Sequence, residues 1–95
     1  MAMMAEYSQR ILQTWGTGRL ACLFGTIVLN KEEGLEEDPQ LRIIVQILRE
    51  RPFNKRRHLH WMYSRDIRTA LKSERYESVR ALERVRDYFQ AHVLD

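Results

Sequence analysis

Residues 38–48 read DPQLRIIVQIL, and the structure of this stretch decides the fold of the chain. Asp38 can accept hydrogen bonds from the free N–H groups of a first helical turn, and Pro39 suits the first position of a helix. Apolar side chains would then occupy more than one face, which predicts a helix that is central or lies at a subunit interface. The alternation of Ile43, Val45 and Ile47 also fits a β-strand, which remains the second interpretation.

The segments before this stretch are helical or ambiguous. Residues 5–15 carry apolar side chains at helical spacing, and the Gly-Thr-Gly sequence at 16–18 is expected to end that helix. Residues 20–29 are apolar and partly β-branched, so they fit a buried helix or a strand, and we favour the helix. Residues 31–38 carry a net charge of −4, which predicts an acidic loop.

The second half of the chain predicts further helical elements. Pro52 interrupts the apolar pattern, and Asn54 and Ser64 are candidate N-caps for the elements that follow. From Ser64 to about Val93, apolar residues recur at steps of three or four, except across residues 72–77. A turn at that gap would produce a helical hairpin, whereas its absence would produce one long helix.

These elements predict one small domain over residues 1–95. The composition, 44% hydrophobic and 31% charged, is typical of a globular chain, and a chain of 95 residues buries only a thin core. We therefore expect a mostly α fold, a small bundle of about four helices that dimerisation would complete. If residues 20–29 and 41–48 are strands, the fold is α+β instead. The side chains expected at a homodimer interface are Leu41, Ile44, Val45 and Leu48.

Cationic side chains are concentrated between residues 49 and 68. The whole chain carries +3, but this segment holds seven positive and two negative side chains. Thirteen of the sixteen cations in the chain are arginine, whose planar guanidinium pairs well with phosphate. Cations bind nucleic acid by releasing the counterions of its phosphates, and nearby aromatic rings stack on bases. The expected phosphate contacts are Arg51, Lys55, Arg56, Arg57, Arg65 and Arg68, and the expected stacking residues are Phe53, Trp61 and Tyr63.

This basic segment predicts a small RNA-binding or other nucleic-acid-binding protein. Zinc-finger, KH and RRM signatures are absent from the sequence, so we expect contact with the phosphate backbone, and with duplex RNA before DNA. The same cations would also suit an acidic protein surface, a nuclear-localisation signal or simple solvation. The alternative function is a structural subunit or adaptor in a larger protein or ribonucleoprotein complex, with residues 20–29 and 41–48 as its interface.

Patterns typical of enzymes and metal sites are absent from the sequence. The Gly-Thr-Gly sequence at 16–18 lacks the rest of a phosphate-binding loop, and neither G-x-S-x-G nor H-E-x-x-H occurs. His58 and His60 have no neighbouring residues to complete a metal site. The single cysteine, Cys22, fits a reducing, cytoplasmic or nuclear location, and no apolar stretch reaches the roughly 20 residues of a membrane span. We expect no catalysis, cofactor, metal or membrane partner.

Residues 65–79 read RDIRTALKSERYESV, and this order resembles the middle of a viral protein family. It is similar to geminivirus pre-coat proteins, in which a helix with Asp, Ile and Arg precedes a second helix with an R-x-Y-x-E-A-like pattern. The resemblance covers about residues 65–93. Members of that family suppress RNA silencing, so the resemblance implies a small viral protein that binds nucleic acid or interferes with its host. No residue's role is carried over from the family.

Overall fold

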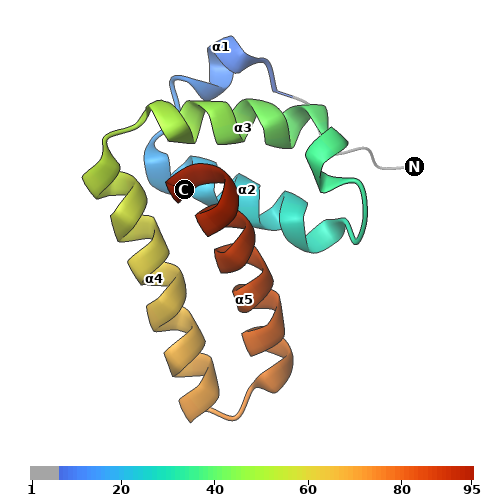
Figure 1. Ribbon diagram of the computed structural model, residues 1–95, viewed down its shortest axis with the longest axis vertical. Coiled ribbons are helices and arrows are strands. Elements are labelled where there is room, and N and C mark those ends of the chain that lie inside the picture. Colours follow the sequence, from blue (N-terminus) through green and yellow to red (C-terminus); the bar gives the residue numbers. More distant parts are fainter. Residues whose placement is uncertain (1–6) are drawn as a thin grey trace.

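The computed structural model describes residues 7–95, which form helices joined by short turns (Figure 1). The mostly α prediction is confirmed: five α-helices, four of them with seven or more residues, and no strand occur in the described residues. The α+β alternative is wrong because residues 20–29 and 41–48 lie inside helices. In chain order the elements are α1 (Gln9–Leu12), α2 (Thr17–Asn30), η1 (Leu35–Glu37), α3 (Pro39–Glu50), α4 (Phe53–Lys72), α5 (Tyr76–Phe89) and the π-helical turn η2 (Gln90–Leu94).

The first helix is shorter than the sequence predicts. Residues 5 and 6 of the expected helix lie outside the described residues, and α1 has only four residues. The Gly-Thr-Gly sequence at 16–18 does not simply follow that helix, because α2 begins at Thr17 with Gly16 as its N-cap. The buried side chain of Gln40 in α3 exchanges two hydrogen bonds with the backbone of Tyr7, which holds the segment before α1 against α3.

The start of α3 follows the prediction. The Asp38 carboxylate accepts a hydrogen bond from the backbone N–H of Leu41 at 2.8 Å, and Pro39 occupies the first turn. The Lys31 ammonium lies 2.9 Å from the same carboxyl group. Burial acts to raise the pKa of Asp38, but the hydrogen bonds from Lys31 and Leu41 outweigh it and hold that pKa below its ordinary value.

Helix α3 is central rather than an interface helix. Leu41, Ile44 and Leu48 have no exposed surface and lie in the main core, where α3 packs on α2 and on η2. The expected homodimer interface is therefore wrong for these three residues, because the fold of a single chain already covers them. Val45 is half-buried and borders a shallow hollow beside Tyr88.

Helix α4 is one continuous helix of 20 residues, not two elements. Ser64 does not cap a helix; its hydroxyl donates to the backbone carbonyl of His60 one turn earlier, at 3.1 Å. Asn54 is the second residue of α4, and Pro52 precedes the helix as its N-cap. Leu59, Tyr63 and Ile67 face the protein at steps of four residues, so packing along one side keeps α4 unbroken past Ser64.

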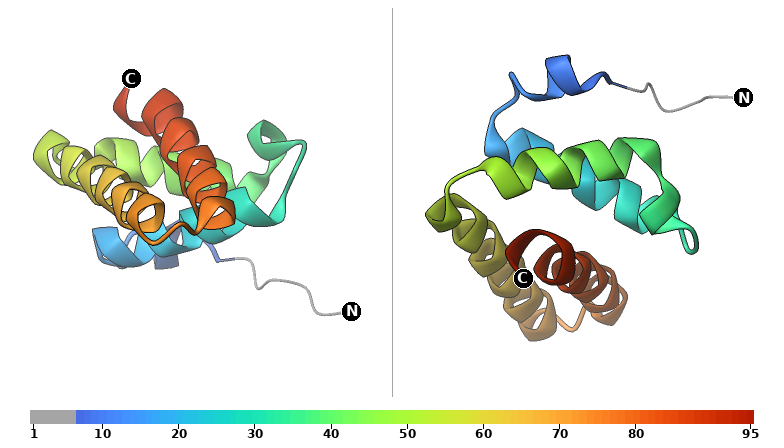
Figure 2. Two further views of the ribbon diagram at one scale, coloured as in Figure 1. Left: turned by 90° about the horizontal axis from the view of Figure 1, so that it is seen from below. Right: turned by 45° about the horizontal axis from the view of Figure 1, so that its top comes forward.

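The C-terminal part is a helical hairpin made by α4 and α5, and α2 crosses one side of it (Figure 2). The turn between them contains Glu74 with a positive φ of 57°, and the N–H of Arg75 donates to the carbonyl of Ala70. Near this tip the buried side chains form a second, smaller cluster of Ile67, Ala70 and Val79. The hairpin is thus anchored in the main core at one end and extends beyond it at the other.

Candidate nucleic-acid interface

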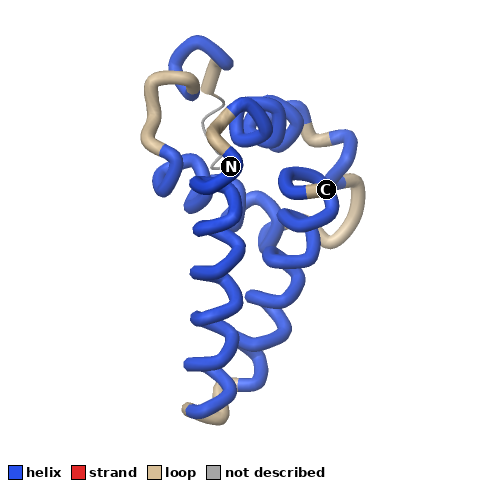
Figure 3. Tube along the Cα trace, turned by 60° about the vertical axis from the view of Figure 1, so that its left-hand side comes forward, coloured by secondary structure: helices blue, strands red, loops and turns tan. Residues whose placement is uncertain are grey.

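One side of α4 faces away from the rest of the protein and carries most of its free cations. Because α4 is continuous, residues three or four apart share a side, and these side chains are all exposed. The row extends about 22 Å along the helix, at 1.5 Å per residue. Figure 3 shows α4 as an uninterrupted helix. We call this surface the outer α4 face; it consists of Arg57, Trp61, Arg65, Arg68 and Lys72.

The cations of the outer α4 face are nearly free of internal partners. Among residues 7–95, the only ion pair that involves them joins Arg65 to Asp66 at 3.7 Å, with both side chains about half exposed. An ion pair at that exposure contributes about 0–1 kcal/mol, so it competes weakly with an external anion. Arg57, Arg68 and Lys72 make no side-chain hydrogen bond within the described residues.

Trp61 lies in the middle of this face and is 49% exposed. The ring of His58 stacks on it, with centroids 5.7 Å apart and an interplanar angle of 18°. The guanidinium carbon of Arg65 lies 5.3 Å from the indole centroid. These contacts, one turn before and one turn after Trp61, restrict the indole and hold the Arg65 guanidinium over an aromatic surface.

Arg51 and Arg56 were expected to contact phosphate, but the structure uses them internally. The Arg51 guanidinium donates to the backbone carbonyls of Gln13 and Trp15, at 3.3 and 2.9 Å, and to the Thr17 hydroxyl at 3.3 Å. Arg56 donates to the carbonyl of Val93 at 2.9 Å and to that of Arg51 at 3.2 Å. Both side chains fasten the start of α4 to other parts of the chain, so we do not retain them as phosphate contacts.

The other expected residues divide in the same way. Tyr63 cannot stack on a base, because its ring packs edge-on against Phe89 in the core, with centroids 5.4 Å apart. The same burial raises the pKa of its hydroxyl. Phe53 is 56% exposed but lies at the start of α4, beside Arg56. Lys55 is exposed on the flank of α4, where it borders a hollow with Thr17.

Lys72 was not among the expected phosphate contacts. It joins the outer α4 face because α4 is continuous. It lies four residues after Arg68, on the same side of the helix. The interpretation of Ser64 as an N-cap and of residues 72–77 as a gap had separated Lys72 from the basic segment. The sequence does contain a signal for this face, because residues 57, 61, 65, 68 and 72 follow one another at steps of three or four.

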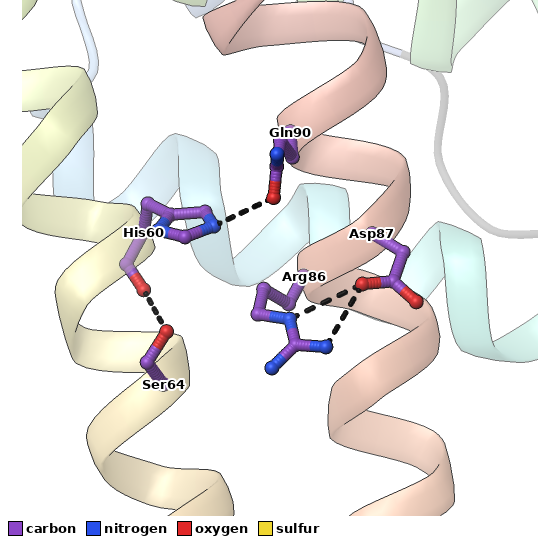
Figure 4. Close-up of polar contacts among 5 residues, drawn as sticks. All are labelled: His60, Ser64, Arg86, Asp87 and Gln90. Carbon is purple, nitrogen blue, oxygen red and sulfur yellow. Dashed lines mark hydrogen bonds and ion pairs between the residues drawn. The ribbon is translucent and has the colours of Figure 1, made fainter.

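The two neighbouring histidines point in different directions. His60 Nε2 donates to the side-chain oxygen of Gln90 at 3.1 Å and so links α4 to the start of η2, whereas Arg86 pairs with its neighbour Asp87 (Figure 4). His58 lies on Trp61 instead. No group of three His, Cys, Asp or Glu side chains with metal-binding geometry occurs in residues 7–95.

Within residues 7–95, no helix combines the length and the apolar character that crossing a bilayer requires. Comparisons of the chain with known protein families, with curated proteins and with solved structures found no match.

Proposed function

We propose that the protein binds RNA through the outer α4 face and contacts the phosphate backbone without reading the base sequence. The observation that carries the proposal is the row of four exposed cations, Arg57, Arg65, Arg68 and Lys72, on one side of a single helix. No carboxylate interrupts the row, because Asp66, the only acidic residue of α4, lies on another side. Each cation that meets a phosphate releases counterions, which drives binding at low salt.

The shape of the row favours a duplex. Duplex RNA has a deep, narrow major groove that side chains cannot read, so proteins recognise it by its regular backbone and its 2′-hydroxyls. A straight helix with cations at every turn or two presents a regular set of donors to such a backbone. Suppression of RNA silencing, which the resemblance of residues 65–93 implies, is one activity that covering duplex RNA would provide.

The role of Trp61 depends on whether the RNA is a duplex or a single strand. Bases inside a duplex are already stacked, so in that case Trp61 acts only by positioning Arg65. In a single strand, an exposed indole stacks on a base and contributes about 1–3 kcal/mol. The contacts of Trp61 with His58 and Arg65 cover part of the ring, which supports the positioning role.

The test is the salt dependence of binding to a short RNA duplex, measured by fluorescence anisotropy. Four phosphate contacts predict a slope of about −3.6 in a plot of log K against log salt concentration, and Arg65→Gln should reduce the magnitude of that slope by about one. Arg80→Gln is the matched control, because Arg80 is an exposed arginine on α5, outside this face. It should leave the slope unchanged.

A slope near zero for the unmodified protein would contradict RNA binding. An acidic protein surface would then be the partner that the free cations suit best. The alternative function as a structural subunit loses much of its expected interface, because Leu41, Ile44 and Leu48 are buried in the core of the single chain.

A further inference from the structure

The side of the hairpin that α2 crosses is hollowed into an apolar trough. Two adjoining hollows of about 440 and 410 Å³ share Leu29, Asp66 and Leu82 among their lining residues. We call this surface the hairpin trough. Its sides are formed by α4 and α5, α2 closes it toward the main core, and the turn at Arg75 borders its far end.

The hairpin trough leaves the lower half of the hairpin incompletely packed. There, the buried cluster that the described residues form consists of Ile67, Ala70 and Val79, all from α4 and α5. Leu29, at the edge of the trough, is 44% exposed. Helical hairpins become stable bundles when further helices cover their apolar side, at distances between helix axes of about 8–10 Å.

We propose that a second copy of this chain packs over the trough, with its own hairpin antiparallel to this one. The two copies complement each other in charge. Among the residues that line the two hollows, only Asp66 and Arg75 are charged, with opposite signs. Asp66 lies toward α2, whereas Arg75 lies at the tip of the hairpin.

A two-fold axis that runs across the hairpins gives both charges a partner, for Asp66 in addition to its 3.7 Å contact with Arg65. It places Asp66 opposite Arg75 of the partner subunit, and the same pair forms a second time by symmetry. Small or apolar side chains, Ala70 and Leu82 among them, then meet at the centre. A parallel arrangement would instead bring like charges to the same level, which is unfavourable.

The antiparallel arrangement has a consequence for the outer α4 face. A rotation about that axis keeps α4 on the same side of both hairpins, so the two copies of the face lie next to each other. The dimer then presents eight cations along one side, twice the four of a single chain. The pairing itself depends only on the trough and not on what the outer α4 face binds.

Sedimentation equilibrium of the full chain, without nucleic acid, tests the proposal. The unmodified protein should form dimers, and Asp66→Arg or Arg75→Asp alone should each weaken dimerisation about tenfold or more, because each places two like-charged pairs in the interface. The double variant Asp66→Arg/Arg75→Asp should restore dimerisation. Recovery by the double variant is the decisive result, since two surface changes that merely damaged folding would add rather than cancel.

A second pair of variants tests the apolar part of the trough. Leu29→Glu should abolish dimerisation, whereas Ile11→Glu should not, although Ile11 is exposed to a similar extent (51% against 44%) and lies on α1. Circular dichroism confirms that each variant is folded. A chain that stays monomeric at every concentration, or a dimer that tolerates all of these substitutions, would overturn the proposal and leave RNA binding by the monomer untouched.

Discussion

Arg56 and Arg57 are adjacent in the sequence and differ completely in their surroundings. The Arg56 guanidinium donates to the carbonyls of Arg51 and Val93 and is half-buried, whereas Arg57 is exposed and starts the outer α4 face. One residue turns an α-helix by about 100°, which is enough to move a side chain from the inside to the outside. The basic segment therefore consists of two groups, cations that fasten the start of α4 and cations that face the solvent.

The density of cations in the sequence therefore overstates the charge that is available to a partner. Arg51 and Arg56 donate their hydrogen bonds to backbone carbonyls, so their acceptors are already inside the chain. The group of cations that faces the solvent loses Arg51 and Arg56 at its N-terminal end and gains Lys72 at its C-terminal end. The two groups should therefore respond differently to substitution.

The largest effect is expected when the outward group is neutralised. The variant Arg57→Gln/Arg65→Gln/Arg68→Gln should weaken duplex RNA binding about 10²–10³-fold at 0.1 M salt, because it removes three phosphate contacts. The midpoint of urea unfolding should not move. The control is Arg10→Gln/Arg42→Gln/Arg80→Gln, which removes the same charge from exposed positions on α1, α3 and α5. Equal losses for both triple variants would show that binding follows net charge and not this face.

The next largest effect is expected for Arg51, one of the cations that fasten the start of α4. Arg51→Ala removes hydrogen bonds to two backbone carbonyls and a hydroxyl, so the free energy of unfolding should fall by about 2 kcal/mol. RNA affinity, measured at a temperature at which the variant is folded, should be nearly unchanged. Arg57→Ala should weaken RNA binding and leave the free energy of unfolding nearly unchanged. If both substitutions destabilise the protein equally, the division into two groups is wrong.

A smaller effect is expected for the ion pair of Lys31 with Asp38, which lies away from α4. Lys31 is paired with Asp38, whose pKa lies below its ordinary value, so Asp38 stabilises the folded chain above about pH 4 and this contribution is lost as the pH falls through the folded-state pKa. Asp38→Ala should lower the free energy of unfolding by about 1 kcal/mol at pH 7. The difference between the variant and the unmodified protein should shrink toward pH 2 in urea titrations, and a constant difference would contradict the assignment.

The smallest effect concerns Trp61. If the indole only positions Arg65, Trp61→Ala should weaken duplex binding by about twofold to fivefold, in line with an exposed cation–π contact. The stability of the fold should not change, because the ring is half exposed. A loss greater than about tenfold on single-stranded RNA, with little loss on duplex, would indicate base stacking and would shift the proposal to single strands.

Local signals in the sequence predict much of the fold. The Asp38-Pro39 start of α3 and the turn near residues 72–77 depend on the backbone preferences of a few neighbouring residues, and both occur in the structure. The choice between a central and an interface position for α3 could not be made locally. The position of α3 depends on which helices cover Leu41 and Leu48, and those helices come from distant segments of the chain.

The candidate site was only partly predictable for the same reason. Arg57, Trp61, Arg65 and Arg68 were expected and lie together, because helical spacing alone brings them to one side. The distant partners of Arg51 and Arg56 include backbone carbonyls 36 to 38 residues away, and every residue has such a carbonyl. No residue type marks an acceptor of this kind, so the sequence could not show that these two arginines are occupied.

The existence of two separate core clusters gives the hairpin two levels of local stability. Amide hydrogens of α4 near Leu59 belong to the main core and should exchange with solvent only when the whole chain unfolds. Those near Ala70 are protected by the smaller cluster and should exchange earlier, through local opening of the tip. In a single chain, we therefore expect the row of cations to be stiffer at Arg57 than at Lys72, so that one end keeps a fixed register while the other adjusts to the curvature of a partner.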